Sequence, residues 1–170
     1  VGIWAHRGCS MMNPENTLLA FKKAAELDGI TGIEFDVQLT KDGEIVVIHD
    51  ERVDRTTDGT ENVRDYTLAE LKKLSITGDD DSYRIPTLRE VLELLKPYCM
   101  NKGLKLNIEL KNSVVRYESM EQKVIDMVSE YGIESHVVYS SFNHDSIGLV
   151  RQLKADADVA YLAGDYHRCM

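Results

Sequence analysis

The chain has 170 residues, of which 43% are hydrophobic and 29% are charged, a balance typical of one globular domain with a core of its own. Its formal net charge of −9 argues against nucleic acid as a partner, because a phosphate backbone normally requires a basic protein surface. The longest purely aliphatic run, Ile45 to Ile48, is far too short to span a bilayer, so we expect no transmembrane segment.

The N-terminal part predicts a strand followed by a helix. Residues 2–6 form a short apolar run that ends in His6-Arg7-Gly8 and predicts a strand rather than a signal peptide. In the helix that follows, Asn16 or Thr17 is a plausible N-cap and Asp28-Gly29 supplies a stop signal.

The next two predicted strands are separated by a turn. Apolar and polar residues alternate over 33–39, and Ile45 to Ile48 forms a second run that leads into His49-Asp50. The few residues between them leave no room for a crossover helix. Two arrangements stay open: a tight hairpin centred on Asp42-Gly43 that pairs Asp36 opposite His49, or barrel strands with one helix missing.

The stretch from about 51 to 84 predicts a small insertion within a single domain that covers residues 1–170. It begins as a polar loop, carries a short helix with a capping box formed by Thr67 and Glu70, and ends in an acidic loop. A second capping box, Thr87 with Glu90, opens the next helix.

The C-terminal part continues the alternation. We expect strands at 104–111, 137–141 and 158–162, and helices near 119–131 and 145–154. Interleaved strands and helices predict an α/β fold. A closed (β/α)8 barrel of the TIM type typically needs about 250 residues. With six candidate strands, this sequence is short of such a barrel by two β/α units.

The cysteine pattern is informative about the compartment. Cys9, Cys99 and Cys169 are odd in number and far apart, and they form no CxxC pair. This favours unpaired thiols in a reducing compartment over a disulfide framework, so we expect a cytoplasmic protein. The sequence carries no information on the oligomeric state.

Two predicted strands place acidic side chains on one face. Side chains two residues apart on a strand share a face, which puts Glu34 beside Asp36, and Glu109 between Asn107 and Lys111. Three carboxylates gathered in a barrel interior require protons, a basic partner or a cation. Oxygen ligands suit one hard divalent cation, Mg²⁺ or Ca²⁺. For either strand alone a solvent-exposed face is the simpler interpretation, but the two together favour a site.

Basic side chains complete the predicted site. His6 and His49 each follow an apolar strand, the position where barrel enzymes place their chemistry, and two imidazoles can divide general acid and base duty. Arg7 has the planar fork that holds a phosphate oxygen, although a surface ion pair is the alternative. Lys111 can offset charge on a phosphoryl group and also serve as a counter-ion for neighbouring carboxylates. His136, His144 and His167 are expected to be hydrogen-bonded structural residues.

Several motifs together resemble the glycerophosphodiester phosphodiesterase family of the PLC-like phosphodiesterase superfamily. His6-Arg7-Gly8 and Pro14-Glu15-Asn16-Thr17 are similar to its opening, and IEFDVQLTKDGEIVVIHD at 33–50 to its central signature. The segment 53–74, the LNIELK run at 106–111 and the later, weaker Ser141-Phe142 follow in the expected order. The similarity runs from residue 3 to about 142, and its first half is highly specific.

The resemblance implies a TIM-type barrel that hydrolyses small glycerophosphodiesters to glycerol 3-phosphate and an alcohol. By this resemblance, the metal ligands are Glu34, Asp36 and Glu109. His6 and His49 match the acid/base pair, and Arg7 and Lys111 match the phosphate-contacting positions. The family's last two barrel strands have no counterpart before Met170.

Two other functions are less favoured by the sequence. A lysophospholipase D needs an apolar groove for an acyl chain, and the sequence shows no amphipathic loop that supplies one. A catalytically inactive barrel used as a binding module predicts loss of a histidine or carboxylate, whereas all seven site residues are present.

Overall fold

The computed structural model describes residues 2–77 and 82–164. Its strands are β1 (Trp4–His6), β2 (Gly32–Leu39), β3 (Ile45–Val47), β4 (Lys105–Leu110), β5 (Val137–Ser141) and β6 (Asp158–Tyr161). Its helices are α1 (Leu18–Glu26), α2 (Leu68–Leu71), α3 (Leu88–Lys102), α4 (Met120–Tyr131) and α5 (His144–Leu153), with 3₁₀ turns η1 (Val63–Asp65) and η2 (Glu134–His136). These positions agree with the elements expected from the sequence to within one or two residues at each end.

The strands form one sheet in which five are parallel. Their order is β1-β2-β4-β5-β6, and β3 lies off this path because it pairs only with β2, in antiparallel orientation. The count of six barrel strands was therefore wrong by one, since β3 is the second arm of a hairpin. In the described residues the sheet is three parallel strands short of eight, rather than two β/α units short.

The β2–β3 hairpin decides between the two arrangements that the sequence left open. Thr40 and Glu44 pair across a loop of three residues in which Gly43 has φ +79°, a left-handed conformation that favours glycine. A loop of three rather than two residues shifts the register by one. Ile48 therefore donates its N–H to the carbonyl of Asp36 (3.0 Å), and the expected pairing of Asp36 with His49 was wrong.

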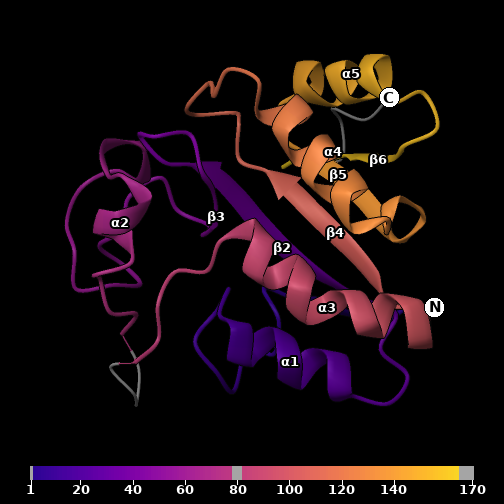
Figure 1. Ribbon diagram of the computed structural model, residues 1–170, viewed down its shortest axis with the longest axis horizontal. Helices are drawn as coiled ribbons and strands as arrows, with labels where there is room; N and C mark the ends of the chain where they lie inside the picture. The colour runs from indigo at the N-terminus through magenta and orange to yellow at the C-terminus, as the bar shows by residue number, and fades with distance from the viewer. Residues whose placement is uncertain (1, 78–81, 165–170) are drawn as a thin grey trace.

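Four helices cover one face of the sheet (Figure 1). α1, α3, α4 and α5 pack side by side in that order, and the main apolar core lies between them and the strands. Alternate residues of β2 and β4 point into this core and are at most 1% exposed: Ile33, Phe35, Val37, Leu106, Ile108 and Leu110. The polar residues between them consequently point to the opposite face, which in a barrel is the interior.

β3 and the stretch that joins it to α3 share a small apolar cluster. It contains Val46, Ile48, Val53, Val63, Leu71, Ile76 and Ile85. Figure 1 shows this stretch, with α2, beyond the arrowheads of β2 and β4. Residues 78–81 of the expected acidic loop lie outside the described residues. The interpretation of residues 51–84 as an insertion in a single domain stays a prediction.

The helix starts follow the capping signals in the sequence. Thr17, and not Asn16, is the N-cap of α1, where its side chain accepts from the backbone N–H of Ala20. Both expected capping boxes form, Thr67 with Glu70 and Thr87 with Glu90. Within the described residues, no helix is both long and apolar enough to cross a bilayer.

Candidate active site

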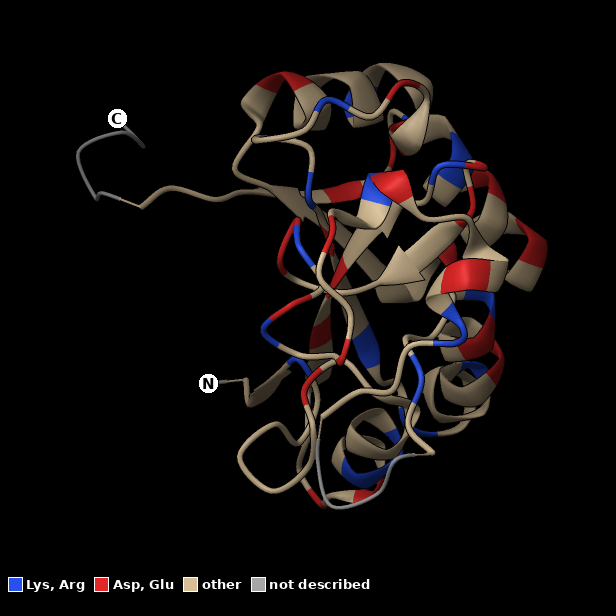
Figure 2. Cartoon of the chain, turned by 90° about the vertical axis from the view of Figure 1, so that its left-hand side faces the viewer, with Lys and Arg blue, Asp and Glu red and all other residues tan. Residues whose placement is uncertain are grey.

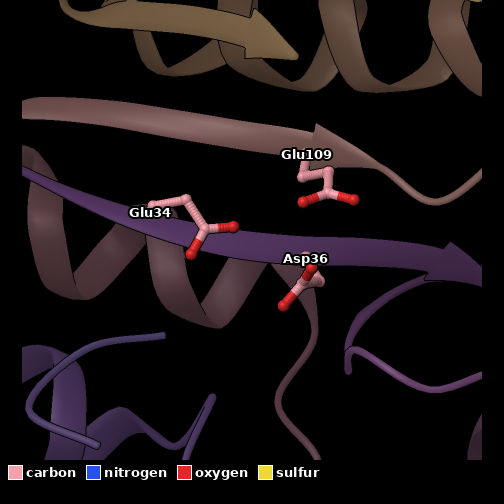
Figure 3. Close-up of side chains that lie close together, drawn as sticks. All are labelled: Glu34, Asp36 and Glu109. Atoms are coloured by element: carbon pink, nitrogen blue, oxygen red, sulfur yellow. The ribbon is translucent and has the colours of Figure 1, made fainter. Parts of the chain in front are cut away.

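Three carboxylates converge on the sheet face opposite the helices. The β2–β4 register places Asp36 beside Glu109 and Glu34 beside Asn107. Glu34, Asp36 and Glu109 each present an oxygen, and these atoms all lie within 4.8 Å of one another. In the view of Figure 3, Glu109 extends from β4 toward β2, whereas the carboxylate of Asp36 lies on the side of β2 away from β4. The sequence-predicted ligand set is thus brought together by the pairing of β2 with β4.

Burial makes this cluster costly without a compensating charge. Asp36 is fully buried and Glu109 is 8% exposed. Burial, followed by repulsion from Asp36, raises the pKa of Glu34 to about 8 and also raises the pKa of Glu109. In the described part of the chain, Oε1 of Glu34 and Oδ1 of Asp36 are buried without a hydrogen-bond partner. Paired carboxylates with spare oxygens fit a divalent cation, which accepts these lone pairs and offsets their charge.

The loop after β1 holds two of the carboxylates. The N–H of Arg7 donates to the carbonyl oxygen of Glu34 (2.9 Å) and to its Oε2 (3.1 Å). The side chain of Asn16 donates to Oδ2 of Asp36 (3.0 Å). The guanidinium Nε of Arg7 lies 3.5 Å from the same oxygen. The β1–α1 loop therefore orients the acidic cluster as well as carrying Arg7.

This loop has an unusual backbone. Arg7 and Asn16 have φ of 57° and 55°, the left-handed region that non-glycine residues seldom adopt and that costs roughly 1–3 kcal/mol each. The N–H of Asn16 donates to the carbonyl of Arg7 (3.1 Å), so the two strained residues support each other. Gly8, which follows Arg7, has φ +80°. A Cβ at this position would lie 2.8 Å from the backbone of Ala20 in α1. Close packing of the loop on α1 thus requires glycine after His6-Arg7.

The side chains of His49 and Lys111 are in contact with each other, and Lys111 also contacts Glu109. Nδ1 of His49 lies 2.5 Å from Oδ1 of Asp50, and Nε2 lies 3.2 Å from Nζ of Lys111. Lys111 also donates to Oε1 of Glu109 (3.3 Å). Lys111 is 11% exposed and therefore desolvated on the cluster side. His49 and Lys111, to which the sequence analysis gave separate roles, are in direct contact.

His6 occupies a more open position. Its register partner on β2 is Glu34, and its Nε2 lies 3.8 Å from Oε2 of that residue. The side chain is 69% exposed. Burial of the remainder, followed by the charge of Arg7, lowers the pKa of His6 below its ordinary value. His6 therefore borders the acidic cluster from the β1 side.

An alternating series of charges connects Arg7 to His49. Nη1 of Arg7 donates to Oε1 of Glu15 (3.1 Å), and Arg55 donates to both oxygens of Glu15 (2.6 and 3.1 Å). Arg55 also donates to both oxygens of Asp50 (2.5 and 3.1 Å), which in turn contacts His49. Figure 2 views the molecule from this side, where acidic and basic segments lie next to one another.

A buried amide fixes the backbone around His49. Nε2 of Gln38 donates to the carbonyls of Ile48, His49 and Asp50 at 3.2, 3.0 and 2.6 Å. Oε1 of Gln38 accepts from the hydroxyl of Tyr117 (3.0 Å). Gln38 is fully buried on the same face of β2 as Asp36. Gln38 of β2 thus fixes the backbone of residues 48–50, which follow β3.

The other expected structural residues lie away from the site. His136 contacts the carbonyl of Leu104 (3.2 Å) and His144 contacts that of Leu162 (2.9 Å), as expected for structural histidines. Cys9 and Cys99 are free thiols. His167 and Cys169 lie outside the described residues.

Comparison with known proteins identifies the family. A family model described as "Glycerophosphoryl diester phosphodiesterase family" matches residues 6–166. The chain belongs to this family. A glycerophosphodiester phosphodiesterase of Caldanaerobacter subterraneus is 48% identical over 166 residues, covering 93% of this chain and 65% of that protein. The chain therefore spans about two thirds of the length of such relatives.

Solved structures of the family share the fold. A glycerophosphodiester phosphodiesterase from Agrobacterium tumefaciens matches with a TM-score of 0.80 at 31% identity, covering 94% of this chain and 65% of that one. An Oleispira antarctica phosphodiesterase in complex with the product sn-glycerol-3-phosphate matches with a TM-score of 0.78 at 32% identity, covering 99% and 70%. These neighbours confirm the expected α/β fold of the TIM-barrel type.

Sequence reasoning missed several residues that support the site. Glu15 and Asn16 stood within the motif that resembles the glycerophosphodiester phosphodiesterases, but Asn16 was interpreted only as a possible helix cap. Gln38 shares the strand face of Glu34 and Asp36, which was a usable signal. Arg55 lies in a polar loop, and nothing in its local pattern indicated a contact with Glu15 40 residues away.

Proposed function

We propose that this chain hydrolyses glycerophosphodiesters to glycerol 3-phosphate and an alcohol, with a divalent cation held by Glu34, Asp36 and Glu109. The observation that carries the proposal is the buried carboxylate cluster, whose oxygens lie within 4.8 Å of one another. Family membership and the neighbour solved with sn-glycerol-3-phosphate support the substrate class.

The donor set supports Mg²⁺ or Ca²⁺ as the ion. All three proposed ligands are carboxylates, and hard cations prefer oxygen ligands. When bound, the cation would polarise a phosphate oxygen and offset charge that develops on the phosphoryl group. It would also remove the proton that burial otherwise keeps on Glu34 near neutral pH.

Arg7 and Lys111 are proposed to bind the phosphate. Both side chains are largely buried, at 17% and 11% exposure, and both are in contact with the acidic cluster. Their charges offset the negative charge of cluster and substrate together, which lets a phosphodiester approach carboxylates that would otherwise repel it. Glu15 holds the Arg7 guanidinium from the side away from the cluster.

The two histidines are proposed to exchange protons with the substrate. The contact of Nδ1 with Asp50 leaves Nε2 of His49 on the Lys111 side, which supports a general-base role in removing a proton from the attacking hydroxyl. That hydroxyl belongs to water or to the glycerol moiety of the substrate. His6, which borders the acidic cluster from the β1 side, is then the group that donates a proton to the oxygen of the leaving alcohol.

Assay of glycerophosphocholine hydrolysis tests this function directly. Glycerol 3-phosphate release would be measured with Mg²⁺, with Ca²⁺ and with EDTA, and we expect turnover only in the presence of a divalent cation. Lysophosphatidylcholine in the same assay tests the lysophospholipase D alternative, and we expect it to be the poorer substrate. An intact, folded preparation without metal-dependent turnover of either compound would refute the proposed function.

A further inference from the structure

Asp50 contacts both His49 and Arg55. Both of its oxygens accept from Arg55, and burial is only partial, since 28% of its side chain is exposed. Arg55 in turn is held by both oxygens of Glu15. The guanidinium therefore bridges two carboxylates that come from segments on opposite sides of the site, the β1–α1 loop and the end of the β2–β3 hairpin.

We propose that Arg55 is a positioning residue for His49: it holds Asp50 against Nδ1 of the imidazole and is itself fixed by Glu15. The inference rests on the proposed function, because it assigns His49 to the reaction. One arginine of the polar loop after β3 would thus help to orient His49 in the active site. Arg55 touches neither the carboxylate cluster nor the proposed phosphate ligands in the described contacts.

The geometry favours arginine at this position over a point charge. A guanidinium presents five donors in a fixed plane and can pair with two carboxylates at once, whereas an ammonium cannot fix both. Arg55 makes four such hydrogen bonds. Its contact is also the largest cause that lowers the pKa of Asp50 to about 2, so Asp50 stays ionised wherever an imidazole titrates.

An ordinary surface ion pair is the alternative, and the same stretch supplies one for comparison. Arg52 pairs with Asp54 two residues away, at exposures of 52% and 44%, and it also donates to the carbonyl of Thr60. Arg55 is similarly exposed at 49%, but its partners are 22% and 28% exposed. Exposed local pairs contribute little, whereas a guanidinium linking two distant segments restricts both.

Paired variants of the two arginines in the full chain separate positioning from a merely structural role. For Arg55→Gln we expect kcat for glycerophosphocholine to fall roughly 10- to 100-fold, the range for residues that orient groups in a site. KM, Mg²⁺ affinity by titration calorimetry and the melting temperature should stay close to those of the native chain. Arg52→Gln, the matched control, should leave kcat unchanged. Arg55→Lys should recover only part of the loss, because lysine lacks the planar fork.

Two further measurements keep the inference testable if Arg55→Gln is unstable. Glu15→Gln keeps the shape of the support and should lower kcat in the same direction. In the metal-free full chain, the proton on Nδ1 of His49 should be visible in long-range ¹H–¹⁵N spectra. It should be lost or exchange-broadened in Glu15→Gln but not in Arg52→Gln, and this readout does not depend on the contact of Glu15 with Arg7.

Each outcome decides one point. No turnover by the native chain would refute the proposed function and leave the spectroscopic test of positioning standing. Native-like kcat in a folded Arg55→Gln, an unchanged Nδ1 signal of His49 in Glu15→Gln, or equal losses in Arg55→Gln and Arg52→Gln would overturn the positioning role.

Discussion

The ammonium of Lys111 lies 3.2 Å from Nε2 of His49. An ammonium group has donors only, so Nε2 accepts and the proton of the neutral ring sits on Nδ1, facing Asp50. The contact therefore assigns the tautomer of His49 from its surroundings. Lys111 thus has two partners, His49 and Glu109.

Replacing Lys111 should therefore affect both binding and turnover. For Lys111→Met, which keeps the length of the side chain, we expect kcat/KM for glycerophosphocholine to fall by roughly two to three orders of magnitude, the usual effect of losing one donor to a reacting oxyanion. Lys105→Met, at the start of the strand that ends just before Lys111 and paired with the carbonyl of Ser135, is the control. Equal activity of the two variants would contradict the assignment of Lys111.

Loss of either imidazole should slow the reaction strongly. We expect His6→Ala and His49→Ala each to reduce kcat by roughly two to four orders of magnitude, as for other acid/base groups. His136→Ala removes a histidine whose side chain contacts the Leu104 carbonyl and should leave kcat unchanged. Steady-state kinetics at saturating metal measures all three. Full activity in one of the site variants would remove that histidine from the mechanism.

The carboxylate cluster should control metal affinity. Glu34→Gln, Asp36→Asn and Glu109→Gln each remove one charge at almost constant shape, so titration calorimetry should show weaker Mg²⁺ or Ca²⁺ binding in all three. Glu121→Gln is a matched control, because Glu121 is also fully buried but pairs with Arg116 and Ser146 instead. Unchanged metal affinity in the three site variants would refute the ligand set.

The raised pKa of Glu34 predicts a pH dependence for the metal-free protein. Its pKa is raised from the ordinary value of 4.5 to about 8 in the folded chain. Between these values the folded state binds more protons than the unfolded state, so the free energy of unfolding should decrease as pH rises from about 4.5 to 8. Melting temperatures measured in EDTA across this range test the slope.

Two comparisons support the interpretation of that experiment. In Glu34→Gln the decrease should be smaller, because the glutamine carries no charge at any pH. Adding Mg²⁺ at pH 8 should restore stability in the native chain, since a bound cation stabilises the folded state. A melting temperature of the metal-free chain that rises steadily from pH 5 to pH 8 would contradict the raised pKa.

Gln38 should be required for the path of the chain around His49. In Gln38→Leu the carbonyls of Ile48, His49 and Asp50 lose their shared donor, and unsatisfied buried acceptors cost roughly 1–3 kcal/mol. We expect lower stability in urea unfolding together with lower kcat. Tyr117→Phe removes only the hydrogen bond to Oε1 of Gln38 and should have the smaller effect on both. A larger effect of Tyr117→Phe would refute this account.

The sequence determined the elements and the residues that face the site. Periodicity over 33–39 and 104–111 separated the core face from the polar face, and the motifs around His6 and His49 indicated the family, which the comparisons confirm. These features are local: side-chain alternation on a strand and capping at a helix start depend on residues a few positions apart.

The tertiary structure decided how distant segments meet. Only strand pairing places Asp36 beside Glu109, 73 positions later in the chain, and only the three-residue loop at 41–43 sets the register that puts Ile48 opposite Asp36. The contact of Arg55 with Glu15 likewise joins residues that are 40 positions apart in the chain. Such contacts depend on the packing of the whole sheet and its loops, and no local pattern in the sequence specifies them.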